Sequence, residues 1–323
     1  MVDEQAAFAA EYEAYRARLR AHCYRMTGSV QEADDLVQET FLRAWRSRAS
    51  FEGRAQLSTW LYRIATNVCL DALADRSGRV LPQDVVRAVA PDDGPRATPP
   101  LAPEVPWLQP MPDRLLDPAA RESIELAFLA ALQHLPVRQR AILLLCDVLG
   151  WSAKEVADIL DLSVAAVTSA LQRAHATMRE LVPSGRSEWA PLAPPSDSER
   201  ELLARYMAAW EQNDPAALTA MLRDDVRFAM PPAALWFAGR ASVEHLFELY
   251  PMRFHGEHRF VATAANGQLA AAGYLRPHGA SDYRFSGVHV LRIEAGQIAE
   301  ITAFGAPLCH GFDLPMIFSA QGV

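Results

Sequence analysis

The sequence predicts a multidomain protein with two all-α helical domains, the second containing a helix-turn-helix, followed by an α+β domain. Three observations predict this fold class. The 323 residues exceed what one compact core usually accommodates. A stretch dense in proline separates two segments with helical periodicity, and beyond residue 197 helices give way to consecutive strand-like runs. We expect domains at residues 1–76, 118–182 and 198–323, joined by linkers at residues 77–117 and 183–197.

The composition excludes several classes of protein. A formal net charge of −8 argues against a protein that coats nucleic acid nonspecifically, because such proteins are basic overall. The four cysteines form no C-x-x-C pair, so we expect reduced cytoplasmic thiols and no metal, cofactor or disulfide framework. No stretch approaches the ~18 apolar residues of a membrane span, and the N-terminus has no apolar run behind a basic start. We therefore expect a soluble cytoplasmic protein with no membrane partner.

The first helical domain contains an amphipathic helix that begins after Ser29. Ser29 with Glu32 forms a capping signal. One side of the helix is apolar and consists of Ala33, Leu36, Val37, Thr40, Phe41, Ala44 and Trp45. The other side carries Glu32, Asp34, Asp35, Gln38 and Glu39. This acidic stripe is either a solvated face or a docking surface for a basic partner.

A second helix in this domain begins near Ser58. Its buried stripe is expected to contain Leu61, Ile64, Ala65, Val68 and Leu73. Trp60, Arg63, Asn67 and Arg54 lie nearer the surface, where a ring, an amide and guanidinium groups suit an unstacked base and its phosphate. The alternative for Trp60 is a place in the core.

The spacer is dense in proline, so it cannot form a long helix and we expect an extended connector. Within it, Trp107 and Leu108 are apolar residues among prolines. A purely flexible linker has little use for a tryptophan, so we expect this segment to pack against a folded surface. A locally apolar turn is the alternative.

The second helical domain ends in a helix-turn-helix signal from Gly150 to Leu181. Ser152 and Glu155 form a capping box, Asp161 to Ser163 break the first helix, and Ser163 caps the second. The expected buried face of the second helix consists of Val164, Val167, Leu171, Ala174 and Met178. Small polar residues outward allow close approach to a DNA major groove. An ordinary helical hairpin is the alternative.

The order of these pieces resembles that of bacterial sigma factors of the extracytoplasmic-function group. The resemblance covers Phe8 to Arg76 and Arg121 to Leu181, and DDLVQETFLRAW and TWLYRIATN are its most specific motifs. It implies that the first domain binds the clamp helices of the largest subunit of core RNA polymerase, and melts and reads the minus-ten element of promoter DNA. The second domain then reads the minus-thirty-five element.

Site residues follow from the resemblance by matching positions. Polymerase docking is implied for Asp34, Asp35, Leu36, Gln38, Glu39 and Phe41. Contact with the melted minus-ten strand is implied for Arg54, Trp60, Arg63 and Asn67. Contact with the minus-thirty-five element is implied for Ser163, Thr168, Ser169, Arg173 and His175. Many family members place cations where Thr168 and Ala170 stand here, so we expect weak promoter binding by the isolated protein.

The C-terminal domain is expected to contain helices over Ser198–Gln212, Pro215–Leu222 and Ser242–Leu249. Strands are expected over Asp225–Met230, His258–Ala264, Gln268–Leu275, Tyr283–Ile293 and Gln297–Phe304. Turns are expected at Asn266 and Gly267, at Pro277 to Gly279, and at Ala295 and Gly296. Helices followed by an antiparallel meander give an α+β domain whose curved sheet can enclose a pocket.

This succession resembles the cone-shaped SnoaL-like, NTF2-like fold, which implies either an enzyme or a domain without chemistry. An acid/base site would use Asp225, His245, His258 or His289 near Trp210, Phe228, Trp236 and Phe304. No local spacing fixes these groups relative to one another, so we expect a structural or ligand-sensing domain with no catalytic residues, and a small-molecule ligand is a candidate partner. The segment VPWLQPMPD is similar to the linker motif of sigma factors with such a domain, where it threads along polymerase or docks on the domain.

Two hypotheses for function follow. In the first, the chain is an alternative sigma factor whose C-terminal domain modulates its activity by holding the DNA-reading domains through the linker. In the second, it is an NTF2-like isomerase or cyclase fused to a helical DNA-binding sensor. A dimeric repressor fits poorly with two separated helical blocks and an acidic docking helix.

Overall fold

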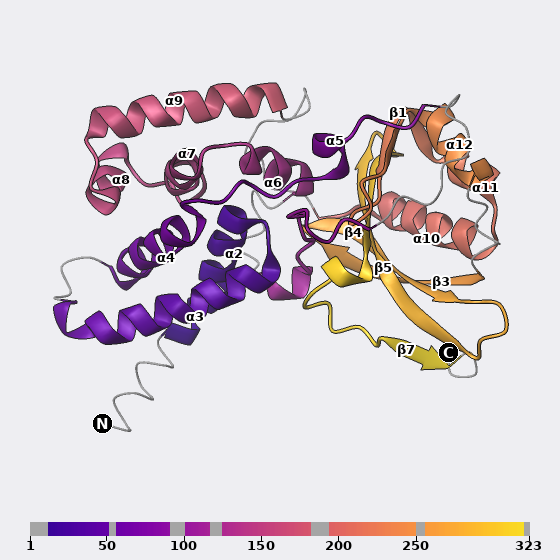
Figure 1. Cartoon of the computed structure of the whole chain (residues 1–323), viewed down its shortest axis with the longest axis horizontal. Coiled ribbons are helices and arrows are strands. Elements are labelled where there is room, and N and C mark those ends of the chain that lie inside the picture. Colours follow the sequence, from indigo (N-terminus) through magenta and orange to yellow (C-terminus); the bar gives the residue numbers. More distant parts are fainter. Residues whose placement is uncertain are drawn as a thin grey trace. The chain divides into compact units, whose positions relative to one another are not determined.

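The computed structural model describes residues 12–51, 56–90, 101–116, 125–181, 194–249 and 256–319. The chain forms two compact units, each built from two separate parts of the sequence. Figure 1 labels their helices and strands and colours them along the chain. The helical unit contains Met1–Arg79 and Arg114–Leu192, and the α+β unit contains Val80–Asp113 and Ala193–Val323. Both predicted helical domains therefore belong to one unit, whereas most of the proline-dense spacer belongs to the other.

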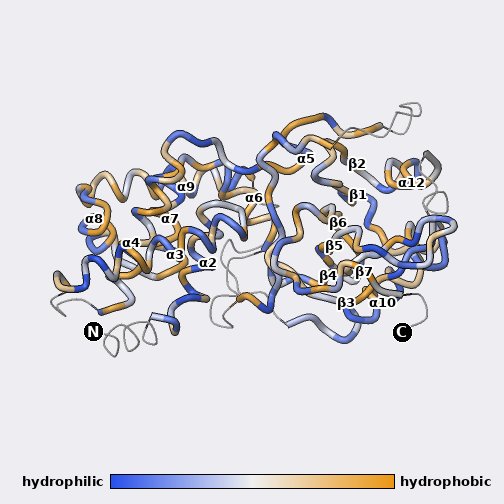
Figure 2. Tube along the Cα trace, turned by 60° about the horizontal axis from the view of Figure 1, so that its bottom comes forward, coloured by the Kyte–Doolittle hydropathy of each residue, from blue (hydrophilic) through white to orange (hydrophobic). Residues whose placement is uncertain are grey.

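The first part of the helical unit consists of α2 (Arg16–Thr27), α3 (Val30–Ser47) and α4 (Leu57–Leu73), with the short 3-10 turn η1 (Arg48–Ser50). Helix α2 ends at Gly28, whose φ of 69° suits a glycine at a helix C-terminus. The Ser29 hydroxyl then accepts a hydrogen bond from the Glu32 N–H at 3.2 Å, which confirms the predicted start of α3. Figure 2 colours α3 and α4 in both blue and orange, as expected for helices with one buried face.

The second part of the helical unit contains α6 (Leu126–Gln133), α7 (Val137–Leu143), the π-helical turn η4 (Leu144–Val148), α8 (Ala153–Leu160) and α9 (Val164–Leu181). Ser152 and Glu155 form the predicted capping box at the start of α8. Asp161 ends α8 in the left-handed conformation with a φ of 51°, so the chain turns sharply before α9. The predicted helix-turn-helix is confirmed.

The α+β unit contains helices α10 (Asp197–Glu211), α11 (Pro215–Ala220) and α12 (Arg240–Leu249). The spacer contributes the single helical turn α5 (Pro82–Val85), and the 3-10 turn η2 (Asp113–Leu115) begins at the end of the spacer. A further 3-10 turn, η6 (Ala306–Leu308), follows the last long strand. The strands are β1 (Leu222–Ala229), β2 (Trp236–Ala238), β3 (Glu257–Ala265), β4 (Gln268–Arg276), β5 (Asp282–Glu294), β6 (Gln297–Gly305) and β7 (Ile317–Ser319). These positions agree with the predicted elements, apart from the short strands β2 and β7.

The strands form one sheet in the order β2-β1-β6-β5-β4-β3, with β7 paired to β5. The predicted antiparallel meander is confirmed for β3 to β6, whereas β1 pairs with β6 in parallel. Asn266 and Gly267 both have positive φ, 58° and 70°, and so do Ala295 and Gly296, as two-residue hairpin turns require. At Gly287 a side chain is excluded, because a Cβ there would lie 2.0 Å from the Phe304 carbonyl oxygen.

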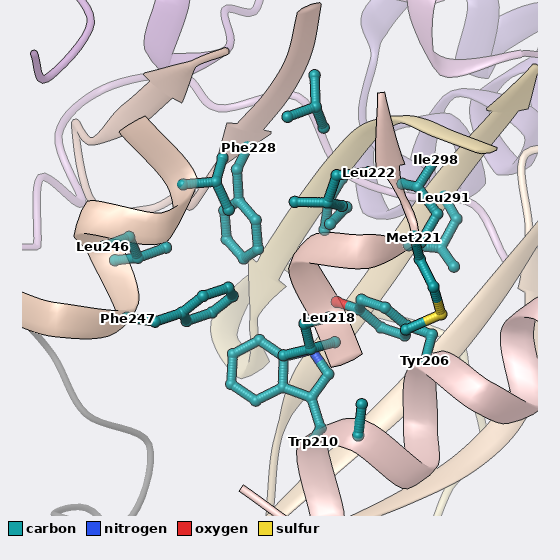
Figure 3. Packing of buried hydrophobic residues seen from close by; sticks show 14 of the residues in the cluster. Tyr206, Trp210, Leu218, Met221, Leu222, Phe228, Leu246, Phe247, Leu291 and Ile298 are labelled. Atoms are coloured by element: carbon teal, nitrogen blue, oxygen red, sulfur yellow. The ribbon is translucent and has the colours of Figure 1, made fainter. Parts of the chain in front are cut away.

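The core of the α+β unit lies between the sheet and its helices. Figure 3 shows Tyr206 and Trp210 of α10 pointing toward Phe247 of α12 and Phe228 of β1. Burial of these large aromatic groups is the main source of stability for such a layer. Among the described helices of the chain, none combines the length and apolar character that a bilayer crossing needs.

Candidate functional site

The acidic face of α3 is the first candidate surface. Asp35 and Gln38 are exposed, and Leu36 is half-buried. Asp34 accepts from Arg20, and Glu39 accepts from the Arg43 Nε at 2.8 Å. Asp35 and Gln38 are therefore the predicted docking residues that a partner can contact without breaking an ion pair described within the unit.

The aromatic ring of Phe41, also a predicted docking residue, is half-buried on the same helix. Its centroid lies 6.0 Å from that of Tyr12, and the Arg16 guanidinium carbon lies 5.0 Å above it. These contacts give the ring a packing role, as its predicted place on the apolar side of the helix indicates.

The second candidate surface lies on α4. Trp60, Arg63 and Asn67 follow one another at steps of three and four residues, which places them along one side of the helix. Trp60 is half-buried, with ring centroids of Phe51 at 5.0 Å and Tyr12 at 6.4 Å. Arg63 is exposed. The fourth predicted member of this set, Arg54, lies outside the described residues.

The third candidate surface is the outward face of α9. Ser163, Thr168, Ser169 and Arg173 are all exposed, as predicted for residues that approach DNA. His175 differs from them, because its Nε2 lies 2.6 Å from the Asp147 carboxylate in η4 and the side chain is partly buried. The imidazole therefore ties α9 to η4.

One residue of α9 contradicts the predicted buried face. The sequence period places Val164 inward, but 47% of it is exposed. Leu162, just before the Ser163 cap, packs in the apolar cluster that contains Val167. This pairing across the cap fills the place that the periodicity assigned to Val164.

The two parts of the helical unit contact each other through Arg140 of α7, whose residue exposure is only 1%. Its Nη1 donates to the Met26 carbonyl at the end of α2 and to Gln133 Oε1 at 2.8 Å. Its Nη2 donates to the carbonyls of Gln133 at 3.0 Å and Leu135 at 3.2 Å. These acceptors are amide oxygens, and burial lowers the pKa of Arg140 to about 10.

Two further contacts join the candidate surfaces of the helical unit. The rings of Tyr62 on α4 and Trp151, just before α8, meet edge to face with centroids 5.7 Å apart. Arg63 Nη2 lies 3.9 Å from the carboxylate of Asp161, in the turn of the helix-turn-helix. The predicted minus-ten and minus-thirty-five surfaces are thus adjacent within this unit.

The spacer packs on the α+β unit through backbone hydrogen bonds (Figure 1). Val89 pairs with Phe237 of β2, and its N–H donates to the Trp236 carbonyl at 2.9 Å. The Trp236 indole N–H donates to the Val86 carbonyl at 2.8 Å. Further along, the Ala102 N–H donates to the Pro232 carbonyl at 3.1 Å. The spacer is therefore bound mainly through its backbone.

The end of the spacer is held by the turn between β3 and β4. The Met111 N–H donates to Asn266 Oδ1 at 2.9 Å, and the Asn266 N–H donates to the Met111 carbonyl at 2.8 Å. Asp113 accepts from the Gly267 N–H at 2.8 Å. The same Asn-Gly pair that closes the hairpin thus presents polar groups to the spacer.

The two apolar spacer residues singled out in the sequence are buried. Trp107 is 2% exposed and Leu108 is fully buried. The Trp107 indole N–H donates to the Ala102 carbonyl at 2.8 Å, and the Trp107 backbone pairs with Val80. The spacer is consequently folded around its tryptophan over residues 80–90 and 101–113.

Two of the candidate acid/base residues meet in the interior of the α+β unit. The His289 Nδ1 lies 2.8 Å from the Tyr206 hydroxyl, and the ring centroids of His258 and His289 each lie 5.5 Å from that of Trp210. Burial lowers the pKa of His289 to about 3 and raises that of Tyr206 far above its usual range. Both groups are therefore neutral near pH 7.

Asp225 does not join this interior group. Asp225 lies on the outward side of β1, since its neighbour Val226 is buried, and Asp224 departs from the alternation because it is exposed as well. The register of β1 is irregular between Leu222 and Arg227. Asp225 forms a surface ion pair with Arg223 at 2.8 Å, which lowers the pKa of the carboxyl. His245 is half-buried on α12. Of the predicted pocket residues, Trp210 and Phe228 share the core, while Trp236 contacts the spacer.

Sequence reasoning missed Arg140, Tyr206 and the contact of the turn residue Asn266 with the spacer. The spacing of Tyr206 and Trp210, one helical turn apart, was an available signal for a shared buried face. Arg140 and Asn266 act on partners more than a hundred residues away, with no local pattern. Within the described residues, no group of three or more His, Cys, Asp or Glu side chains is arranged to hold a metal ion.

Comparison with known families gives three matches along the chain. The Sigma-70 region 2 family matches residues 11–79, and the Sigma-70 region 4 family matches residues 125–178. The SnoaL-like domain family matches residues 203–301. The three matches correspond to α2–α4, to α6–α9, and to most of the α+β unit.

Two RNA polymerase sigma factors are similar to the chain over most of their length. The chain is 44% identical over 318 residues to the ECF RNA polymerase sigma factor SigG of Mycobacterium tuberculosis, covering 95% of this chain and 84% of that protein. It is 29% identical over 320 residues to the sigma factor SigJ of the same organism, covering 94% and 90%. The crystal structure of SigJ has the same fold, with a TM-score of 0.61 at 22% identity over 93% of this chain and 96% of that chain.

Proposed function

The chain belongs to the extracytoplasmic-function family of RNA polymerase sigma factors, and from this premise we propose that it binds core polymerase through α3 and directs it to promoters. The exposed Asp35 and Gln38, beside paired Asp34 and Glu39, support an acidic docking face for the clamp helices of the largest subunit. Opposite charges steer and orient such encounters. This face, on a chain with a net charge of −8, is the observation that carries the proposal.

Positive charge introduced at exposed positions tests the docking face. Asp35→Lys with Gln38→Lys leaves the internal pairs of Asp34 and Glu39 intact, so the protein should fold normally. Capture of core polymerase by this variant is expected to fall at least tenfold at low salt. The control replaces Glu201 and Glu244, exposed on α10 and α12, by lysine, which adds at least as much positive charge to the other unit. Equal capture by all three proteins would contradict the proposal.

For promoter recognition, we assign the minus-ten element to Arg54, Trp60, Arg63 and Asn67, and the minus-thirty-five element to α9. The exposure of Arg63, Ser169 and Arg173 supports these roles. The contact of Arg63 with Asp161 supports a need for the two surfaces to separate on polymerase. Permanganate footprinting of open complexes tests the first assignment, because Arg63→Ala with Asn67→Ala should reduce melting without reducing capture of polymerase.

We propose that the C-terminal domain modulates this activity by binding the spacer. The bound spacer would restrict the DNA-reading surfaces until polymerase competes for the spacer. The backbone hydrogen bonds of Val86, Val89, Ala102 and Met111 support such a role, because they bind the spacer as an extended segment. Deletion of residues after Leu181 should change transcription from the cognate promoter in a reconstituted assay. Unchanged output would remove this part of the proposal.

We propose a regulatory rather than catalytic role for the same domain. Asp225, the expected partner for an interior base, is exposed and paired with Arg223, and Tyr206 and His289 are neutral and bonded to each other. A small molecule that stabilises the domain is a second candidate trigger. A thermal-shift screen tests it, and turnover of a ketone or ester by the full chain would favour the enzyme hypothesis instead.

The proposed site of action is the cytoplasm.

A further inference from the structure

The first turn of α9 presents an aliphatic surface that no part of the described core uses. Val164 is 47% exposed, whereas Val167, Ala170, Ala174 and Met178 are buried. The apolar cluster beneath α9 contains Val167 and Leu162 but not Val164. An exposed valine costs helix propensity relative to alanine and contributes little to stability here. Its side chain therefore suits contact with something outside the chain.

The two hydroxyl groups beside Val164 are both engaged by the helix backbone. The Ser163 Oγ accepts from the Ala166 N–H at 3.2 Å, and the Thr168 Oγ1 donates to the Val164 carbonyl at 3.0 Å. Because the Thr168 hydroxyl turns back to its own helix, its methyl group contributes to the exposed surface beside Val164. Ala165, also exposed, adds a fourth methyl group to the two of Val164 and the one of Thr168.

Charged groups are absent from this stretch of the sequence, since Val164 to Gln172 contains no acidic or basic residue and the first cation is Arg173. The paired hydrogen bonds by which Arg or Lys reads guanine are therefore not available from the first two turns of α9. In a helix-turn-helix, these turns are the part that reaches the base edges. Among the base edges in the major groove, the apolar group is the C5-methyl of thymine.

We infer that Val164, with the methyl group of Thr168, reads thymine methyl groups in the minus-thirty-five element. This inference rests on the proposed function. It adds to that function the nucleobase that is recognised, thymine, and a residue that determines specificity, Val164. It predicts that discrimination at one or two positions depends on a methyl group rather than on hydrogen bonds. Replacement of thymine by deoxyuridine removes that methyl group and leaves every hydrogen-bonding atom in place.

The test uses holoenzyme assembled from the full chain and core polymerase, on a promoter selected by that holoenzyme from a random library. Each minus-thirty-five thymine, on either strand, is replaced in turn by deoxyuridine, and competition for open-complex formation is measured. At one or two positions, deoxyuridine should reduce competition for open-complex formation roughly 3- to 5-fold, which corresponds to the burial of one methyl group. Holoenzyme with Val164→Ala should form open complexes roughly 3- to 10-fold less well on the unmodified promoter. It should also be insensitive to deoxyuridine at those positions.

Paired substitutions separate the methyl groups from the hydroxyl. Thr168→Val keeps a methyl at that site and should retain the response to deoxyuridine, whereas Thr168→Ser should weaken it. Leu181→Ala removes an aliphatic side chain that is 42% exposed at the other end of α9. It lies about 25 Å along the helix from Val164 and should have no effect on the template series.

The outcomes distinguish this inference from the proposed function. Suppose that wild-type holoenzyme forms and selects a promoter, yet its response to deoxyuridine equals that of the Val164→Ala variant; this result overturns the inference alone. A loss with Val164→Ala that is uniform across all templates also overturns it, because that pattern indicates a nonspecific contact. Failure of the wild-type chain to form holoenzyme or select any promoter overturns both.

Discussion

Met111 and Asn266 exchange two hydrogen bonds across 155 positions of sequence: each donates its backbone N–H, one to the Asn266 side-chain oxygen and the other to the Met111 carbonyl. Asn266 is fully buried and has a φ of 58°, a conformation that asparagine tolerates better than most residues. One residue therefore closes the β3–β4 hairpin and also holds the end of the spacer.

Asn266→Gly should release the end of the spacer while leaving the hairpin able to form, because glycine accepts a positive φ. The loss of the side-chain acceptor for the buried Met111 N–H should cost about 1–3 kcal/mol of local stability. Hydrogen exchange of residues 101–113 measures this, and it should speed up by at least fivefold. Asn213→Gly, at another asparagine with positive φ, is the control, and equal exchange in both variants would contradict the prediction.

Arg140 should be essential to the stability of the helical unit. Arg140→Ala leaves the carbonyl of Met26 and the buried side chain of Gln133 without their donor, so unfolding free energy should fall by about 2–4 kcal/mol. Urea denaturation followed by circular dichroism measures the change. Arg138→Ala, exposed on the same helix, should cost less than about 0.5 kcal/mol. Similar values for the two variants would show that the buried hydrogen bonds are unimportant.

His22 predicts how the helical unit responds to acid. Its Nε2 lies 3.0 Å from the Thr66 hydroxyl, and burial lowers its pKa from 6.5 to about 3. Below pH 6.5 the unfolded chain binds a proton that the folded chain excludes, so stability should fall as the pH drops from 6.5 toward 3. The slope should approach about 1.4 kcal/mol per pH unit.

Unfolding in urea at pH 7, 6, 5 and 4 tests this slope. His22→Gln keeps a polar partner for Thr66 and removes the titration, so its slope should be flatter than that of the wild type. His310→Gln changes an exposed histidine and should keep the wild-type slope. Identical slopes for all three proteins would assign the acid response to other groups, with His289, whose pKa is also lowered to about 3, as the next candidate in the α+β unit.

Local signals in the sequence account for most of the fold. The helix cap at Ser29, the capping box at Ser152, and the Asn266–Gly267 and Ala295–Gly296 turns depend on residues within a few positions of one another. Such features can be identified without knowing the tertiary structure. The helices predicted to begin at Ser29, Ser58, Ser152 and Ser163, and the helices and main strands of the C-terminal domain, therefore lie within a few residues of their predicted positions.

The features that sequence reasoning missed depend on contacts that the period of a single helix or strand does not show. Val164 fits the helical period of the buried face, but the chain reverses just before it and Leu162 takes its place against Val167. Asp225 offers a carboxylate, but it lies on the outward side of β1 beside the buried Val226, and Arg223 pairs with it there. Arg140 looks like a surface cation until the end of α2 supplies its acceptors. For Arg140 the deciding partner belongs to another element of the fold.

His175 should stabilise the helix-turn-helix rather than read promoter DNA. Its Nε2 lies 2.6 Å from the Asp147 carboxylate, and this contact fixes the side chain against η4 instead of toward the outward face of α9. His175→Gln should lower the unfolding free energy by about 1 kcal/mol and leave base preference at the minus-thirty-five element unchanged. Arg173→Ala should instead weaken promoter binding on all templates and reduce the salt slope by about one. A change in base preference with His175→Gln, at wild-type stability, would reverse these two assignments.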